Sequence, residues 1–469
     1  MPKSRQWCVA VPSLLAVTAG VAAAAAGTPP PGPDEDVYKF IKGQGAVSAF
    51  GDTGARGGFD AENITLRAWL DLPAFPGGSR SGNNCWGYVS PSGREYAIMG
   101  LERGFGFVEV TDPDNPVIVG VITGPTSLWH DVRCVGHYAY GVSEAGSGIQ
   151  VIDMSQIDNG TVTLVKNKTQ LGHSSTHTIA VNPDSGYLYL AGTNINNGGL
   201  TAVSTTDPDD PTIVGAWNQM YVHEAQIVTY TEGPYAGREI AFCYSGFDGG
   251  WSQTGLRIVD VTDKSNMFTI STVSWAGASY SHQGWLSEDR KYLYIDDELD
   301  EYFGFSNTTT TRIFDVQDLA NPVFKGTFTT GLPSIDHNQY THNGMIFQAN
   351  YHSGLHVFDY DSDPLAPTEI AWIDTYPADD GIGFDGAWGN YPFFPSGTII
   401  ISDIDRGLFV VTLDVCDADF NGDGTVNTQD VLAFLNAWTA GDASSDINGD
   451  GTINTQDVLA FLNLWTAGC

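Results

Sequence analysis

Positive charge is scarce in this chain. Its 469 residues include 20 Lys and Arg against 55 Asp and Glu, which gives a formal net charge of −35. Such a surface repels phosphate backbones and anionic lipids, so nucleic acid is excluded as an expected partner. Only 16% of the residues are charged, and 55 are glycine. This composition is typical of an all-β protein with many tight turns and not of a disordered or coiled-coil chain.

Long apolar runs are also lacking, except near the N-terminus. Two basic residues, Lys3 and Arg5, precede an apolar run that ends in small residues up to Gly27. This order predicts a secretory signal over residues 1–27 and an extracellular mature protein. No later segment is apolar enough to span a membrane, so no membrane span is expected after the signal is removed. Residues 28–60, rich in Pro, Gly and Asp, are expected to form an irregular lead-in.

Cysteine is rare as well. Five cysteines follow the signal: Cys85, Cys134, Cys243, Cys416 and Cys469. An odd number in an exported protein implies at least one free thiol. Two pairings stay open from position alone, one between Cys416 and Cys469 and one between Cys85 and Cys134.

A short apolar pattern recurs along most of the chain. GLRIVDVTD from Gly255 has six relatives: GFVEVTD, GIQVIDM, GLTAVST, TRIFDVQ, GLHVFDY and GLFVVTL. The seven copies lie 42 to 56 residues apart. A strand-based period of this size indicates a radial array of small sheets, because one such unit cannot bury its own faces.

The unit that starts at His177 contains four expected strands, HTIAVN, YLYLAGT, GLTAVST and TIVGAW. Four strands in each of seven units predict a seven-bladed β-propeller over residues 61–415. A β-helix is the alternative, but its rungs are much shorter than these units. The run Ile64–Leu72 has no preceding partner, and the last copy lacks a following strand. We therefore expect the N-terminal strand to complete the last sheet and close the ring.

Histidine opens the first strand of five successive units. These residues are His130, His177, His223, His282 and His337, with Cys85 and Asp385 at the equivalent places in the first and last units. First strands of a propeller line its channel, so the histidines are expected to converge at one mouth, with carboxylates such as Glu144 and Glu298 nearby.

Imidazoles beside a carboxylate suit a transition metal whose bound water could serve hydrolysis. The structural alternative is that each histidine bridges neighbouring blades, and repetition in an equivalent place favours that interpretation. The catalytic residues stay unknown; the candidates are His177, His223, His282, His337 and Asp385.

The acidic run Ile295–Glu301 allows three interpretations. It could supply a carboxylate pair for glycoside hydrolysis or a further calcium site, but such runs are more often solvated loops. The sequence contains no GxSxG elbow, P-loop, HExxH or dinucleotide motif, so the enzyme classes that rely on them have no support.

Residues 84–411 resemble the LVIVD-repeat, choice-of-anchor B family of exported proteins. The matching phrases include CWGYVSPSGREYAIMG, SLWHDVRC, LRIVDVTDKSN, YSHQGWLSEDRKYLYIDDELDE and SDIDRGLFVV. The resemblance implies a propeller-like repeat domain held at the cell exterior, without an established activity. His130 stands where the family pattern has arginine, so no role is carried over to it.

Residues 416–469 contain two near-identical loops, each followed by an apolar helix pattern. They differ at three of 23 aligned positions. Each alternates carboxylates, amides and a threonine as a calcium loop does, with glycine at the sharp turn in position 6. Position 12 is Asp instead of Glu, and no helix precedes the first loop. This paired arrangement resembles a type I dockerin, which implies two calcium ions and a cohesin-like or other surface protein as partner.

The predicted calcium ligands occupy equivalent positions in the two loops. They are Asp419, Asn421, Asp423, Thr425, Asn427 and Asp430, and Asp446, Asn448, Asp450, Thr452, Asn454 and Asp457. In the helices, one stripe contains Val431, Leu435 and Trp438 and the other Val458, Leu462 and Trp465; these stripes are expected to form the core between the two helices.

Two functions follow from these observations. The first is a non-catalytic extracellular binding and display module, positioned by the dockerin and linked to polysaccharide or cell-surface assembly. The second is a metal-dependent hydrolase of extracellular polysaccharide with its site at the channel mouth. Whether the chain is an enzyme stays open.

Overall fold

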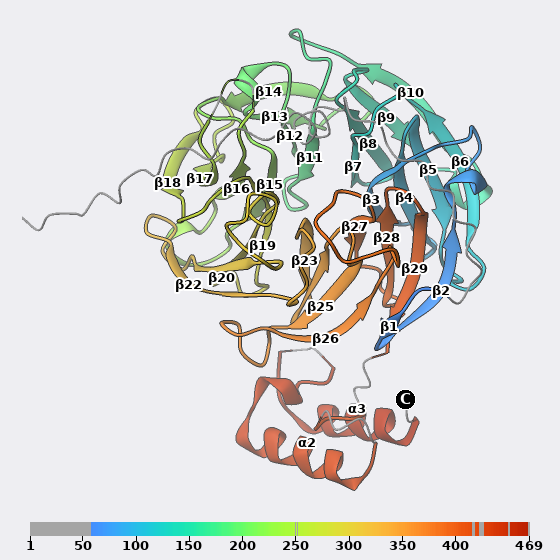
Figure 1. Cartoon of the computed structure of the whole chain (residues 1–469), viewed down its shortest axis with the longest axis vertical. Helices are drawn as coiled ribbons and strands as arrows, with labels where there is room; N and C mark the ends of the chain where they lie inside the picture. Colours follow the sequence, from blue (N-terminus) through green and yellow to red (C-terminus); the bar gives the residue numbers. More distant parts are fainter. Residues whose placement is uncertain are drawn as a thin grey trace, which may run out of the picture.

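Seven antiparallel sheets form a ring, which is followed by two helices (Figure 1). The computed structural model describes residues 58–248, 250, 252–414, 418–421, 426–448 and 451–467. The prediction of a seven-bladed propeller with a small helical C-terminal unit is confirmed. The predicted signal over residues 1–27 lies outside the described residues, as does most of the lead-in.

Blades 1 to 5 each consist of four consecutive strands, ordered from the channel outward. Blade 1 contains β3 (Gly82–Val89), β4 (Glu95–Leu101), β5 (Gly104–Glu109) and β6 (Val117–Thr123). Blade 2 contains β7 (His130–Val135), β8 (Tyr138–Ser143), β9 (Ile149–Asp153) and β10 (Thr163–Lys168). Blade 3 contains β11 (Thr178–Val181), β12 (Leu188–Ala191), β13 (Leu200–Ser204) and β14 (Thr212–Trp217). Blade 4 contains β15 (Glu224–Thr229), β16 (Glu239–Ser245), β17 (Gly255–Asp260) and β18 (Phe268–Val273). Blade 5 contains β19 (Ser281–Leu286), β20 (Tyr292–Asp297), β21 (Thr311–Asp315) and β22 (Val323–Phe328).

The last two blades recruit strands from the start of the described chain. Blade 6 contains β23 (Asn338–His342), β24 (Met345–Ala349), β25 (Leu355–Asp359), β26 (Thr368–Ile373) and the short β1 (Ala61–Glu62) at its outer edge. Blade 7 contains β27 (Ala387–Tyr391), β28 (Thr398–Asp403), β29 (Gly407–Leu413) and β2 (Ile64–Leu70).

The pairing of β2 with β29 closes the ring. The two strands run antiparallel from the pair Ile64 and Leu413 to the pair Leu70 and Leu408. The expectation that the N-terminal strand completes the last sheet is therefore confirmed, and two open sheet edges are removed. The additional pairing of β1 with β26 was not predicted.

Apolar side chains between neighbouring blades form the core. Each of the seven interfaces has its own buried cluster, and that between blades 1 and 2 contains Phe105, Phe107, Val132 and Ile152. Because both faces of each sheet are covered, the middle strands are mostly buried; all six residues of β17 are buried. The repeated motif at Gly255 is the third strand of its blade.

The pairing of Cys85 with Cys134 is wrong, because both are free thiols. Cys85 packs in the apolar cluster between blades 7 and 1, whereas Cys134 packs against the cluster between blades 1 and 2. The equivalent places in consecutive blades thus face different interfaces. Cys416 and Cys469 lie outside the described residues.

The C-terminal unit consists of α2 (Thr428–Ala440) and α3 (Thr455–Ala467). Asn427 caps α2, with Asp430 reaching back to complete a capping box. The core prediction was partly wrong: the rings of Phe434 and Phe461 stack at 4.2 Å, whereas Leu435 and Leu462 are exposed.

None of the helices that the structure describes is long and apolar enough to cross a bilayer. Short 3₁₀ turns occur at Leu72–Ala74 (η1), Ile157–Asn159 (η2), Asn196–Gly198 (η3), Gly233–Tyr235 (η4) and Ala443–Ser445 (η5).

The backbone conformation at the start of the repeated motif explains the glycine at position 255. Gly255 has φ +127°, and a Cβ there would collide with the carbonyl oxygen of Val273 on the paired outer strand. Replacing Gly255 by Ala should therefore destabilise the fold by about 1–3 kcal/mol, measured by urea denaturation. Gly326→Ala is the matched control, because its Cβ would meet nothing within 4 Å. Equal effects of the two substitutions would contradict this account.

Candidate functional site

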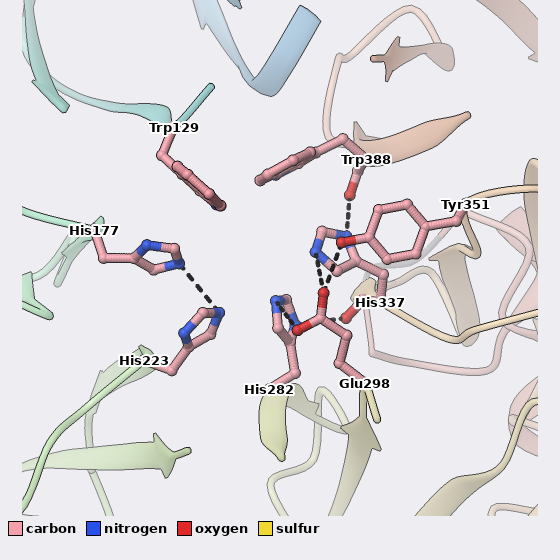
Figure 2. A pocket seen from close by; sticks show the side chains of 8 residues that line it. All are labelled: Trp129, His177, His223, His282, Glu298, His337, Tyr351 and Trp388. Atoms are coloured by element: carbon pink, nitrogen blue, oxygen red, sulfur yellow. Dashed lines mark hydrogen bonds and ion pairs between the residues drawn. The ribbon is translucent and has the colours of Figure 1, made fainter. Parts of the chain in front are cut away.

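Four of the predicted histidines meet at one end of the channel (Figure 2). His177, His223 and His337 directly precede the inner strands of blades 3, 4 and 6, and His282 is the second residue of β19. The Nε2 atoms of His177 and His223 lie 3.2 Å apart. The ring centroid of His282 lies 4.4 Å from that of His223 and 4.1 Å from that of His337. The predicted convergence is confirmed for these four side chains.

The Nδ1 atoms of two rings are held by backbone carbonyls. His282 Nδ1 lies 3.0 Å from the carbonyl oxygen of His337, and His337 Nδ1 lies 2.6 Å from that of Trp388. A carbonyl can only accept, so Nδ1 carries the proton in both rings. Each neutral ring therefore presents an Nε2 lone pair, the state in which imidazole binds a metal.

The other two rings have side-chain partners. His177 Nδ1 lies 2.8 Å from Glu144 Oε1. His223 Nδ1 lies 3.0 Å from the Tyr280 hydroxyl and 3.3 Å from the Tyr221 hydroxyl. These tyrosines were missed from the sequence. Their signal is the repeated Tyr-x-His spacing at 221–223 and 280–282.

Glu298 supplies a carboxylate to the same cluster. Its oxygens lie 3.9 Å from His282 Nε2 and 3.8 Å from His337 Nε2, and one accepts a 2.7 Å hydrogen bond from the Tyr351 hydroxyl. It follows β20 directly, as expected for a second strand that returns to the face where the first begins.

Burial sets the protonation of these groups. It lowers the pKa of His337 to about 3 and that of His282 well below its usual value. It also raises the pKa of Glu298 to about 7. For His177, burial acts to lower the pKa, but the hydrogen bond and charge of Glu144 raise it overall. Burial thus favours the neutral imidazole form of His282 and His337.

Three of these side chains fit a metal ion. One ligand atom each from His223, His282 and Glu298 lies within 4.8 Å of the other two. Two imidazole nitrogens and one carboxylate oxygen form a donor set that suits zinc or iron and leaves positions for water.

The cavity enclosed by the cluster is small. It measures about 20 Å³ and is lined by Trp129, His177, His223, His282, Glu298, His337, Tyr351 and Trp388, all of them buried. This space holds about one water-sized ligand. A metal ion with its water fits such a space, whereas a sugar ring does not.

His130 differs from the other histidines. Its ring meets Phe105 edge-on, with centroids 5.4 Å apart, and it does not line the first cavity but a neighbouring one, which it shares with His177, His223 and His282. Arg133 of β7 lies 2.7 Å from Asp131 Oδ1 and 3.4 Å from Glu224 Oε1 of β15. This buried ion cluster belongs to the inner strands and is a structural part of the channel.

Asp385 is not brought to the histidines. It does not line either cavity at this mouth, and the charges that act on it come from His352 and Asp379. Asp385 precedes β27 by two residues, whereas His337 directly precedes β23. In blade 7, the side chain that reaches the cavity is Trp388, which lies beside Trp129 along one side of the pocket in Figure 2.

A larger pocket lies at the outer side of blade 6. It has a volume of about 350 Å³ and is lined by Asp60, Thr330, Leu332, Ser353, His356, Glu369, Trp372, Asp374 and Asp380. His356 Nδ1 lies 2.5 Å from Glu369 Oε1, and Trp372 Nε1 donates to Glu62 Oε2. Pockets of this size accept small ligands, and an indole beside several carboxylates suits a polyhydroxylated one.

The two C-terminal loops repeat one set of contacts. Asp430 accepts from the backbone N–H groups of Asn427 at 2.7 Å and Asn421 at 3.2 Å. Asp457 accepts from Asn454 and Asn448 at 2.7 and 3.3 Å. Both position-12 carboxylates therefore reach back into their loops, and the oxygen-rich donor set fits calcium. Asp423, Thr425 and Asp450 lie outside the described residues.

Comparison with known proteins identifies this unit. Residues 417–463 match the family model described as Dockerin type I domain. No curated protein matches the chain. The predicted relation of residues 84–411 to the choice-of-anchor B family stays a prediction.

The chain is similar to several solved structures at low sequence identity. Kuenenia stuttgartiensis hydrazine synthase has 11% identity and a TM-score of 0.48, covering 73% of this chain and 96% of that chain. The periplasmic gluconolactonase PpgL of Pseudomonas aeruginosa has 10% identity and a TM-score of 0.48; the match covers 69% of this chain and 89% of that chain. The Cps50 (Swd1) β-propeller domain of Myceliophteria thermophila has 10% identity and a TM-score of 0.49; the match covers 74% of this chain and 99% of that chain. These matches say nothing about activity.

The channel cluster generates a metal-binding prediction. The full chain, loaded with zinc and dialysed, should retain about one zinc ion more than the variant His223→Ala/His282→Ala, because that variant loses two of three ligands. His137→Ala is the matched control, since this histidine is exposed between β7 and β8. Elemental analysis measures the difference; equal zinc in all three proteins would contradict the prediction.

Proposed function

We propose that this chain is an exported binding and display module, whose dockerin attaches the propeller to a cohesin-bearing protein outside the cell. The observation that carries the proposal is the dockerin match over residues 417–463. It is supported by the repeated loop contacts of Asp430 and Asp457, and by the signal pattern of residues 1–27.

The surface expected to meet a cohesin occurs twice. Thr428 and Gln429 on α2 are exposed, as are their counterparts Thr455 and Gln456 on α3. Leu432 and Leu459, one turn further on, are 61% and 62% exposed. Exposed apolar side chains ringed by polar ones are typical of a protein interface.

The helices are related by reciprocal contacts. Trp438 Nε1 donates to the carbonyl of Asn454, and Trp465 Nε1 donates to that of Asn427, each at 2.8 Å. Each helix thus braces the loop of the other repeat. Calcium in one loop should therefore stabilise both, and bound calcium supplies much of the fold in small units of this kind.

Duplication of the surface predicts redundancy. Leu432→Asp or Leu459→Asp alone should leave type I cohesin binding within about twofold, because the second surface remains, whereas the double variant should lose more than about 100-fold in affinity. Chelation of calcium should abolish binding by the unaltered chain. Calorimetry with a purified cohesin measures each case.

The control for this experiment adds the same charge elsewhere on the helices. Asn436→Asp/Asn463→Asp changes two exposed residues and should bind as the unaltered chain does. Full binding by the double leucine variant would show that the leucines do not form the docking surface.

For the ligand of the propeller, we infer a polysaccharide bound at the pocket of blade 6. The pocket offers the indole of Trp372 and oxygens of Glu369, Asp374 and Asp380, which provide an apolar face and hydrogen-bond acceptors for hydroxyl groups. The channel cavity, by contrast, is too small for a sugar ring.

Trp372 provides a direct test of this site. Trp372→Ala should weaken binding of soluble glucan or xylan oligosaccharides by about tenfold, because the stacking face is lost, whereas Trp372→Phe should retain most of it. Affinity electrophoresis measures the change. Binding that is unaffected by Trp372→Ala would place the ligand elsewhere.

A metal-dependent extracellular hydrolase is the second candidate function. It is favoured by the donor set of His223, His282 and Glu298, which resembles the ligand types of catalytic zinc sites. Because the cavity admits little beyond a metal ion and water, binding is preferred over polysaccharide hydrolysis. If the unaltered chain hydrolysed a polysaccharide and the variant His223→Ala/His282→Ala did not, hydrolysis would become the preferred function.

A further inference from the structure

The acidic run after β20 is buried instead of solvated. The chain turns over residues 298–304, and Asp296, Asp300 and Glu301 are at most 1% exposed. Asp336, which lies between blades 5 and 6 in the sequence and two residues before β23, is also fully buried. The interpretation of this run as a solvated loop is therefore wrong.

Part of this buried charge has ordinary partners. Asp297 accepts hydrogen bonds from the backbone of Tyr280 at 2.6 Å and Ser279 at 2.9 Å. Arg312, on β21, forms an ion pair with Asp300 Oδ2. Asp296 Oδ1 accepts from Thr311 at 3.1 Å and from Gln348 at 3.0 Å.

Within this group, six carboxyl oxygens accept no hydrogen bond from any described residue. They are Asp296 Oδ2, Asp300 Oδ1, both oxygens of Glu301 and both oxygens of Asp336. The amide oxygen of Asn350 is also buried without a donor, and its amide nitrogen bonds to Gln348, which in turn donates to Asp296. Buried oxygens without donors are costly, and each one in a native structure calls for an explanation.

These oxygens converge. One carboxylate oxygen from each of Asp300, Glu301 and Asp336 lies within 4.8 Å of the other two. Calcium–oxygen bonds measure about 2.3–2.6 Å, so two oxygens bound to one ion can be up to about 5 Å apart. Asp296 belongs to β20, the strand that leads into the turn; its Oδ2 is buried without a donor, and its charge acts on Asp336.

One guanidinium cannot balance this group. Arg312 is the cation that acts on Asp296, Asp297, Asp300 and Asp336. Its guanidinium forms an ion pair with Asp300, and this single positive charge cannot neutralise four buried carboxyl groups, so the remaining like charges repel one another. A bound cation relieves the same repulsion while leaving the groups ionised.

We propose that Asp300, Glu301 and Asp336, with Asp296 beside them, form a binding site in the propeller for a hard divalent cation of the calcium and magnesium class. The donors are all oxygen, which distinguishes this site from the imidazole cluster and from sites for softer metals. It is separate from the dockerin loops and goes beyond the proposed function.

The site joins two blades and supports the channel cluster. Asp300 and Glu301 belong to the turn after β20 of blade 5, whereas Asp336 leads into β23 of blade 6. The same turn carries Glu298, which reaches His282 and His337. A cation here therefore fixes the turn that presents the carboxylate of the channel cluster.

The test compares the full chain with Glu301→Gln/Asp336→Asn, which removes two charges but keeps side-chain volume. Equilibrium dialysis should show one bound calcium ion fewer per chain in the variant than in the unaltered chain. Both proteins contain the same dockerin loops, so calcium bound there does not affect the difference. Parallel dialysis with magnesium identifies which cation the site takes. The control is Asp289→Asn, an exposed carboxylate of the same blade that pairs with Lys291.

Thermal unfolding of the propeller gives a second readout that needs no ion count. Calcium or magnesium should raise the unfolding temperature of the unaltered chain and of Asp289→Asn, but not that of Glu301→Gln/Asp336→Asn. In chelator, the double variant should be at least as stable as the unaltered chain, because carboxylate repulsion is reduced. The same calcium and magnesium stoichiometry in the unaltered chain and the double variant would overturn the proposal.

Discussion

The antiparallel pairing of β2 with β29 closes the ring, and the crowding at one mouth of the channel depends on that closure. Seven first strands begin around a narrow axis, so side chains that a solitary strand would leave in water are buried against one another. His177, His223, His282 and His337 lie in that position. An open ring would relax this crowding and expose the sheet edges that β2 and β29 cover. Architecture and chemistry are therefore coupled through one strand pair that joins the two ends of the propeller sequence.

Polar groups that this closure buries need hydrogen-bond or ionic partners. The histidine cluster and the neighbouring carboxylate cluster obtain these partners in different ways. The imidazoles of His282 and His337 donate hydrogen bonds through Nδ1 and are neutral, which leaves their Nε2 atoms and Glu298 facing a cavity of about 20 Å³. The carboxyl groups of Asp300, Glu301 and Asp336 have too few donors for their oxygens, and among the residues that the structure describes their cationic neighbour is Arg312, which pairs with Asp300. One turn, from Glu298 to Gly304, contributes to both clusters. The nitrogen-rich set suits a transition metal, and the all-oxygen set suits a hard cation.

Periodicity predicted the architecture because each blade repeats the same burial problem. The spacing of GLRIVDVTD gave seven units, and the unpaired strand at Ile64 predicted the closure. The position and burial of a side chain were harder to predict where they depend on contacts between blades. The acidic run is polar in sequence, yet its carboxylates are buried in the fold, where Arg312 of β21 pairs with Asp300. Asp385 lies one residue too far from its strand to reach the histidines. In the dockerin, helical period alone placed Leu435 in the core, whereas the packing of α2 against α3 buries Phe434 and Phe461 instead.

The central claim is that the buried polar clusters of the propeller are cation sites. The most direct measurement is anomalous X-ray diffraction from crystals of the full chain grown with zinc and calcium, recorded on both sides of the zinc absorption edge. We expect a zinc-specific peak among His223, His282 and Glu298, and a calcium peak without zinc character among Asp300, Glu301 and Asp336. Density no stronger than water at both places, with the carboxyl oxygens paired through shared protons, would contradict the account.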